Sequence, residues 1–342
     1  MGRDTLRVGI IGAGSNTREK HIPGLRAIEG VEIVSVRNST DESSRQAAAE
    51  LDIPRWHSDW RELVEADDID AVVIGTWPYM HCRCSVAALE AGKHVMCEAR
   101  MARTVDEARR MLAAAQMRPQ LVAQVVPSPF TLEVDATIRR MIGEGFIGDP
   151  VAIEVIDRQG FASESPAYHW RNDFELSGFN TMTLGIWYEA IMRWLGGATS
   201  VQATGRIVRP LLDRDGELYV TRVFDLMNVS AEMACGAQLR MHLSAVTGPP
   251  ERAVTIAGTK GALRYDGEEL TCCEGDEEQF APVGIPDEER GAWRVEEEFI
   301  GAIRGDEEIT LTRFEDGLRY MEFVEAAVRA GQRRERIELP MA

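Results

Sequence analysis

The first 125 residues alternate between short apolar runs and amphipathic stretches, and this alternation constrains the fold more than any other feature. The apolar runs are LRVGIIG (6–12), VEIVSV (31–36), DAVVIGT (70–76), KHVMC (93–97) and LVAQVV (121–126). Strands that are apolar on both faces and separated by helices are typical of a parallel sheet covered on both sides. We therefore predict a doubly wound α/β domain over residues 1–125.

The pattern changes after residue 125. Strand-like runs at 151–157, 200–208, 218–226, 230–244, 252–258 and 262–266 follow one another, mostly with no helix between them. Helices are expected at 135–145, 180–195 and 314–330. This order predicts an α+β domain with a large, mostly antiparallel open sheet over residues 126–342.

Composition narrows the class of partner. The 38 basic and 56 acidic residues give a net charge of −18, which opposes binding to nucleic acid. The N-terminus resembles no signal peptide, and no apolar run approaches the ~20 residues that span a bilayer. The six cysteines show no CxxC pair and no zinc spacing, so we expect reduced thiols, no metal and a cytoplasmic location.

A glycine-rich turn, GIIGAGSNT (9–17), joins the first strand to the first helix. Gly12 and Gly14 permit a tight turn and a close backbone approach to a pyrophosphate at the helix N-terminus. Ser15, Asn16 and Thr17 complete the predicted cradle, with Thr17 in the place of a third glycine. The alternative is a glycine turn without a ligand, which the repeating β/α units disfavour.

The end of the second strand bears on the choice of cofactor. A carboxylate there would bind the ribose hydroxyls and repel a 2′-phosphate. This chain has Arg37, Asn38 and Ser39 instead, followed by Thr40. A cation with neutral donors predicts NADP, and NAD is the alternative if Arg37 is only a solvated surface charge.

Several stretches together resemble the glucose–fructose oxidoreductase / myo-inositol dehydrogenase (Gfo/Idh/MocA) family over nearly the whole chain. They are VGIIGAG with HIPGL, AALEAGKHVMCE, YHWRNDFELSGFN, GTKGAL and FEDGLRYMEFVEAAVRA. The resemblance implies an N-terminal Rossmann domain, a C-terminal α/β domain with an open sheet, and NAD(P)-dependent chemistry on sugars, polyols or related carbonyl compounds. It also implies a homodimer or homotetramer, which we expect to form through the C-terminal sheet.

The chain departs from this family at the catalytic positions. The family's Glu-Lys-Pro motif is here Glu98, Ala99 and Arg100. The family's aspartate and histidine, one helical turn apart, align with Thr183 and Trp187. Alanine, threonine and tryptophan cannot accept the proton that must leave an alcohol as hydride departs.

Other side chains are therefore candidates for that chemistry. His169 is the first choice as proton acceptor because an imidazole titrates near neutral pH, and Tyr188 is the second. Arg100 is expected to bind a substrate carboxylate or a developing oxyanion, although a salt bridge to Glu98 would explain it equally well. We expect Thr183 and Trp187 to line the substrate pocket, although a plain core position would explain Trp187 equally well. The other predicted cofactor contacts are Thr76, Trp77, Pro78, His81, Glu98, Trp170 and Arg171.

Three functions fit these observations. The first is an NADP-dependent oxidoreductase acting on a carbohydrate-like or hydroxy-acid small molecule. The second is a lyase, hydratase or isomerase that retains its cofactor and uses a transient oxidation. The third is a non-catalytic sensor that binds a dinucleotide and a small ligand. The sequence leaves all three open.

Overall fold

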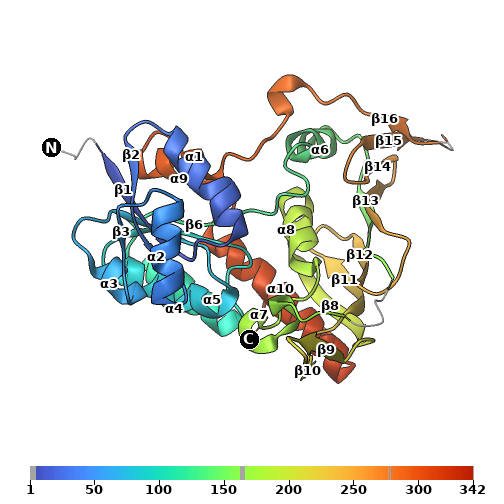
Figure 1. Ribbon diagram of the computed structural model, residues 1–342. Helices are drawn as coiled ribbons and strands as arrows, with labels where there is room; N and C mark the ends of the chain where they lie inside the picture. Colours follow the sequence, from blue (N-terminus) through green and yellow to red (C-terminus); the bar gives the residue numbers. More distant parts are fainter. Residues whose placement is uncertain (1–4, 162–165, 276, 278, 342) are drawn as a thin grey trace. The chain divides into compact units, whose positions relative to one another are not determined.

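The computed structural model describes residues 5–161, 166–275, 277 and 279–341 (Figure 1). The chain divides into two compact units. The first contains Met1–Pro127 and Arg294–Leu318, and the second contains Ser128–Trp293 and Arg319–Ala342. Among the residues described, no helix is long and apolar enough to cross a membrane.

The first unit contains a six-stranded, fully parallel sheet in the order β3-β2-β1-β4-β5-β6. The strands are β1 (Leu6–Ile11), β2 (Val31–Arg37), β3 (Arg55–Trp56), β4 (Ala71–Ile74), β5 (His94–Cys97) and β6 (Ala123–Val125). The order reverses between β1 and β4, and ligands of such sheets bind beyond the carboxyl ends of the strands at this point. The predicted doubly wound fold is confirmed.

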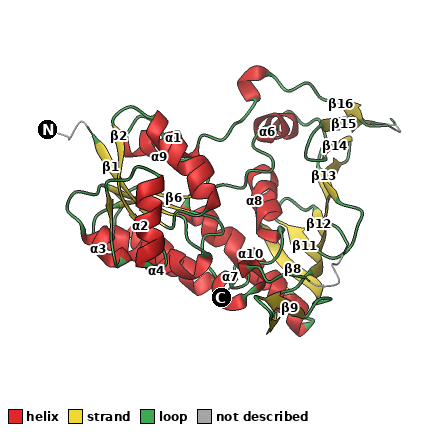
Figure 2. Ribbon diagram, viewed as in Figure 1, coloured by secondary structure: helices red, strands yellow, loops and turns green. Residues whose placement is uncertain are grey.

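Helices cover both faces of this sheet (Figure 2). They are the π-helical turn η1 (Thr17–His21), α1 (Ile22–Ala27), α2 (Asp41–Glu50), α3 (Trp60–Glu65), α4 (Pro78–Glu90), α5 (Val105–Gln116) and α9 (Val295–Arg304). Local sequence fixes several starts. The Thr40 and Thr104 hydroxyls accept N–H groups in the first turns of α2 and α5, and Pro78 is the first residue of α4.

The first unit also includes a segment that the expected division at residue 125 did not assign to it. Helix α9 packs against α1, and the Gln124 side-chain amide donates 2.7 Å hydrogen bonds to Glu298 and to the Leu311 carbonyl. Buried polar groups need such partners, so this late segment completes the first core. The apolar spacing of Val295, Phe299 and Ile300 is the sequence signal for α9.

The second unit contains a nine-stranded sheet in the order β16-β15-β14-β13-β7-β12-β11-β8-β17. The strands are β7 (Pro150–Arg158), β8 (Ala198–Arg206), β11 (Leu226–Met233), β12 (Gln238–Ser244), β13 (Glu251–Gly258), β14 (Gly261–Tyr265), β15 (Leu270–Glu274), β16 (Ala281–Pro282) and β17 (Ile337–Glu338). Among the described strands of this sheet only β7 and β12 pair in parallel, so the predicted mostly antiparallel sheet is confirmed. A separate hairpin contains β9 (Leu211–Arg214) and β10 (Glu217–Val220).

One face of this sheet is buried and the other is polar. Along β11 and β12 the buried residues alternate with exposed ones, as the period of two requires. The unit's helices are α6 (Asp135–Gly143), η2 (Trp170–Asn172), α7 (Phe174–Ser177), α8 (Leu184–Leu195), η3 (Asp287–Glu289) and the later part of α10 (Phe314–Arg333). Tyr188 of α8 stacks on Phe323 of α10 with ring centroids 3.6 Å apart.

Candidate dinucleotide-binding site

A cavity of about 380 Å³ lies in the first unit at the loops that follow β1, β2 and β4. These loops and α4 supply ten of the residues that line it: Gly12, Ala13, Gly14, Asn38, Ser39, Gly75, Thr76, Trp77, Tyr79 and Met80. The structure therefore brings the predicted glycine turn together with the predicted segments after the second and fourth strands. This is the position at which a doubly wound sheet holds its ligand.

Two glycines allow the turn after β1 to approach the loop after β4. Gly12 has φ +90°, and a Cβ there would lie 2.7 Å from the Thr76 nitrogen. A Cβ at Gly75 would lie 2.0 Å from the Thr17 hydroxyl and 2.4 Å from the Gly12 carbonyl oxygen. Thr17 is buried and donates to that carbonyl at 3.0 Å. The close approach usually secured by a third glycine is thus secured by Gly75, which the sequence reasoning missed.

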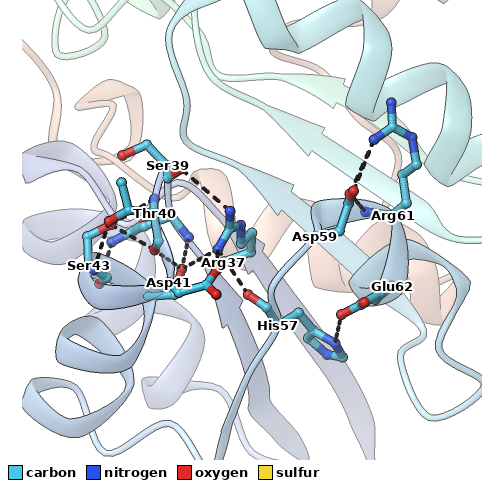
Figure 3. Close-up of polar contacts among 11 residues, drawn as sticks. Arg37, Ser39, Thr40, Asp41, Ser43, His57, Asp59, Arg61 and Glu62 are labelled. Atoms are coloured by element: carbon cyan, nitrogen blue, oxygen red, sulfur yellow. Dashed lines mark hydrogen bonds and ion pairs between the residues drawn. The ribbon is translucent and has the colours of Figure 1, made fainter.

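The predicted ribose-end residues have structural partners. Asn38 accepts the Ala13 N–H at 2.7 Å and donates to the Ser43 carbonyl at 3.1 Å, so it fixes the glycine turn to α2. Arg37 donates to Asp41 at 2.8 Å and also to neutral acceptors (Figure 3). Arg37 is therefore more than a solvated surface charge.

Aromatic side chains form one wall of the cavity. Trp77 is 44% exposed, and Trp60 and Tyr79 also line the pocket. The Arg61 guanidinium lies 4.5 Å from the centre of the Trp60 ring. Flat aromatic faces suit the adenine of a dinucleotide. Trp60 was not predicted, because its position as the first residue of α3 gave no signal of a ligand.

His81 differs from the prediction that it contacts the cofactor. Its side chain is fully buried, and its ring nitrogens lie 2.9 Å from the carbonyl oxygens of Thr76 and Arg100. Burial lowers the pKa of His81. The imidazole joins the loop after β4 to the loop after β5, so any effect on a ligand is exerted through those loops. Pro78 is likewise buried, at the start of α4.

Glu98, at the end of β5, belongs to a charged cluster that includes a buried histidine. His21 has no exposed surface, and its Nε2 lies 3.0 Å from Glu98 while its Nδ1 lies 2.5 Å from Glu296 of α9. Glu98 also accepts N–H groups from Ala99, at 2.9 Å, and from the Asn16 side chain. Glu98 therefore has a cation partner in His21, from a distant part of the chain.

The pKa values of this pair move in opposite directions. Burial alone would lower the pKa of His21, but hydrogen bonds with Glu296 and Glu98 outweigh it and raise the pKa to about 9. Burial would raise the pKa of Glu98, but the bonds from His21, Asn16 and Ala99 lower it to about 2. The sequence reasoning missed His21 and Glu296, and only the HIPGL stretch pointed to the histidine.

In the second unit, His169 caps the short helix η2. Its Nδ1 accepts the Arg171 N–H at 3.2 Å, and its ring centre lies 5.5 Å from that of Trp170. The Arg171 guanidinium lies 4.3 Å from the centre of the Trp170 ring. Partial burial and the Arg171 charge lower the pKa of His169, which keeps the imidazole neutral near pH 7. A neutral imidazole on an exposed residue can accept a proton.

Two residues of α8, Trp187 and Tyr188, differ from their predicted roles. Trp187 has no exposed surface and donates from Nε1 to Asp157 at 2.9 Å, so it is a core residue and offers no face to a substrate. The Tyr188 hydroxyl accepts the Ala198 N–H at 2.8 Å, and burial raises its pKa to about 12. Tyr188 is therefore unsuited to act as a base near neutral pH. Thr183 is buried, and its hydroxyl has no hydrogen-bond partner among the described residues.

Together, the sheet order, the glycine turn and the pocket at the order reversal define a dinucleotide-binding protein of the Rossmann class. Comparison with known proteins identifies the family. The model of the oxidoreductase family with an NAD-binding Rossmann fold matches residues 6–125, and the GFO/IDH/MocA C-terminal domain matches residues 136–264. The chain belongs to the Gfo/Idh/MocA family of oxidoreductases.

Individual relatives agree with this assignment. 1,5-Anhydro-D-fructose reductase of Ensifer adhaerens is 37% identical over 152 residues, 44% of each chain. Inositol 2-dehydrogenase of Klebsiella pneumoniae is 26% identical over 193 residues, 56% of this chain and 54% of the relative. The matches thus span about half the length of these relatives. Levoglucosan dehydrogenase in complex with NADH and L-sorbose has the same fold, with TM-score 0.84, 21% identity, and coverage of 98% of this chain and 99% of that one.

Proposed function

We propose that this protein is an oxidoreductase that transfers hydride between NADP(H) and a carbohydrate-like or hydroxy-acid small molecule. The observation that carries the proposal is the cavity at the order reversal of the sheet, where Gly12 and Gly75 bring backbone close to the ligand position. Relatives named for reduction of an anhydro-sugar and oxidation of inositol support this substrate class. The absence of a carboxylate at Asn38, beside Arg37, supports NADP over NAD.

The acid–base chemistry is assigned to side chains outside the family's motif. His169 would accept the hydroxyl proton as hydride leaves, because its lowered pKa keeps it unprotonated. Arg100 would bind a carboxylate or oxyanion of the substrate, since a guanidinium stays charged and cannot act as a base. Trp170 and Arg171 remain predicted cofactor contacts of the second unit.

The location and assembly follow from the same sequence arguments. We propose a cytoplasmic homodimer or homotetramer formed through the polar face of the nine-stranded sheet. Exposed or half-buried residues on that face include Asn228, Ser230, Arg240 and His242. Size-exclusion chromatography with light scattering measures the assembly, and a monomer at micromolar concentration would contradict this part of the proposal.

The experiment that tests the function combines binding with turnover. Calorimetric titration with NADP⁺ and NAD⁺ measures the affinity of the cavity. Gly75→Leu is the control, because its side chain would occupy the space in which the loops after β1 and β4 approach each other. Absorbance of the reduced nicotinamide then follows turnover against sugars, polyols and hydroxy acids. We expect binding that Gly75→Leu abolishes and net reduction with at least one polyol or hydroxy acid. Folded wild-type protein that binds neither coenzyme would refute the proposal.

The replacement of the family's lysine, aspartate and histidine by Ala99, Thr183 and Trp187 favours a second candidate. A protein with the cofactor pocket but without those groups could retain NAD(P) and convert its substrate without net reduction, or could sense a ligand without converting it. Substrate conversion with unchanged nicotinamide absorbance would favour the first of these alternatives. Tight coenzyme binding without any conversion would favour the second.

A further inference from the structure

We propose that Asp41 is a specificity-determining residue that occupies the anion position on Arg37 and thereby weakens the binding of NADP(H). This inference rests on the proposed function and adds to it a residue that limits the preference for the phosphorylated coenzyme. Asp41 is the first residue of α2 and hydrogen-bonds Arg37 Nη1 at 2.8 Å (Figure 3). A carboxylate in this position stands in for one edge of a phosphate.

The Arg37 guanidinium is held in place by acceptors other than Asp41. Nη1 also lies 3.2 Å from the Ser44 hydroxyl and 3.2 Å from the His57 carbonyl oxygen. Since Nη1 carries two hydrogens, three acceptors are more than it can fully satisfy. Removal of Asp41 therefore leaves no donor unpaired, and the side chain, which is only 14% exposed, stays where it is.

The space for a 2′-phosphate lies beside Arg37. Arg37, Ser39 and Ser43 line the cavity at the loop where a Rossmann protein holds the adenosine ribose. Arg37 Nη2 has one long hydrogen bond in the described structure, 3.4 Å to the Ser39 carbonyl oxygen. A 2′-phosphate can therefore form two hydrogen bonds with Arg37, one from Nη2 and one from the Nη1 hydrogen that Asp41 now accepts.

A phosphate that binds Arg37 has to exchange with the Asp41 carboxylate. The Asp41 side chain is 54% exposed, so it can turn into water when a phosphate arrives. If it stays, its negative charge lies within hydrogen-bonding distance of the same guanidinium and repels the phosphate. In both cases NADP(H) binds more weakly than Arg37 alone would allow. NAD(H) has no 2′-phosphate, so its affinity does not depend on this exchange.

Asp41→Asn provides the direct test, and Glu42→Gln is the matched control. Both substitutions remove one negative charge from the first turn of α2, but only Asp41 is bonded to Arg37. We expect Asp41→Asn to tighten NADP⁺ and 2′,5′-ADP binding about five-fold, the scale of an exposed ion pair, with NAD⁺ unchanged. Glu42→Gln should give less than half of that change. Arg37→Gln should weaken 2′,5′-ADP at least ten-fold and leave NAD⁺ within two-fold.

Calorimetric titration of the wild-type protein and these three variants distinguishes the outcomes. Equal effects of Asp41→Asn and Glu42→Gln would overturn the inference, because the change would then be a general charge effect at the helix end. Tightening of NAD⁺ together with NADP⁺ would also overturn it, while leaving the proposed function intact. Failure of every folded variant and of the wild type to bind either coenzyme would instead refute the proposed function, and the inference with it.

Discussion

Replacing His21 with leucine should destabilise the first unit by about 3 kcal/mol at pH 6. The magnitude follows from the pKa of His21, which rises from 6.5 to about 9 on folding, because each pH unit corresponds to about 1.4 kcal/mol. Glu98 gives a similar figure, since its pKa falls from 4.5 to about 2. The two describe one interaction and are not added. Breaking a buried ion pair typically costs about 3–5 kcal/mol, which agrees with the destabilisation expected for His21→Leu.

The pH dependence gives the sharper signature. His21 binds its proton more tightly in the folded state, so its contribution is complete below pH 6.5 and is lost as the pH rises through about 9. Glu98 is ionised more easily in the folded state, so its contribution is present above pH 4.5 and is lost as the pH falls through about 2. Wild-type stability should therefore have a plateau between about pH 4.5 and 6.5 and decline towards pH 9.

The variant should lose the decline above pH 6.5. It also removes the imidazolium that contacts both Glu98 and Glu296, so the repulsion between these two carboxylates is no longer offset by it and stability should rise on acidification from pH 7 to 5. Urea unfolding followed by tryptophan fluorescence from pH 5 to 9 measures both effects.

His94→Gln is the control, because His94 is a half-buried histidine of the same sheet that accepts the Val122 N–H at 2.9 Å. Burial lowers the pKa of His94, so its contribution is lost on acidification and not above pH 6.5. An unchanged alkaline decline in His21→Leu, or the same change in both variants, would show that His21 is not the charged partner of Glu98.

Three further predictions concern single side chains. Gly75→Ala should weaken dinucleotide binding at least ~10-fold in calorimetry, because the new Cβ would lie 2.0 Å from the Thr17 hydroxyl; affinity within two-fold of wild type would refute the close approach. Tyr188→Phe should lower the free energy of unfolding by about 1–3 kcal/mol, since the Ala198 N–H loses its partner, while kcat stays unchanged; a large loss of kcat would restore Tyr188 as a candidate base. His169→Ala should lower kcat/KM about 10²–10⁴-fold, and the wild-type value should fall only as the pH drops through a pKa below 6.5; an identical acid limb in the variant would assign the base elsewhere.

The sequence predicted the class of fold because periodicity reports burial directly. Strands apolar on both faces require helices on both sides of a sheet, and the glycine turn requires a backbone that approaches its neighbour closely. These constraints are local, so they were visible without contacts. The late helix α9 was missed although Val295, Phe299 and Ile300 mark it, because a contiguous boundary was assumed.

Periodicity could not separate a pocket wall from a core on α8. Ten of its twelve residues are buried, so the helix is apolar almost all round. Its sequence pattern therefore does not show which residues would face a pocket. Trp187 was expected to face a substrate, and the structure gives its indole N–H to the buried carboxylate of Asp157. That choice depends on a strand 30 residues away, which no local pattern encodes.

The sequence alone determined that this chain forms a doubly wound sheet with a glycine turn and belongs to an oxidoreductase family. Only the tertiary structure decided which distant groups meet, such as His21 with Glu296, 275 residues later, and Thr17 with Gly75. The reason is that local patterns fix which faces are buried, whereas charge pairing and close backbone approach depend on how elements distant in sequence pack together.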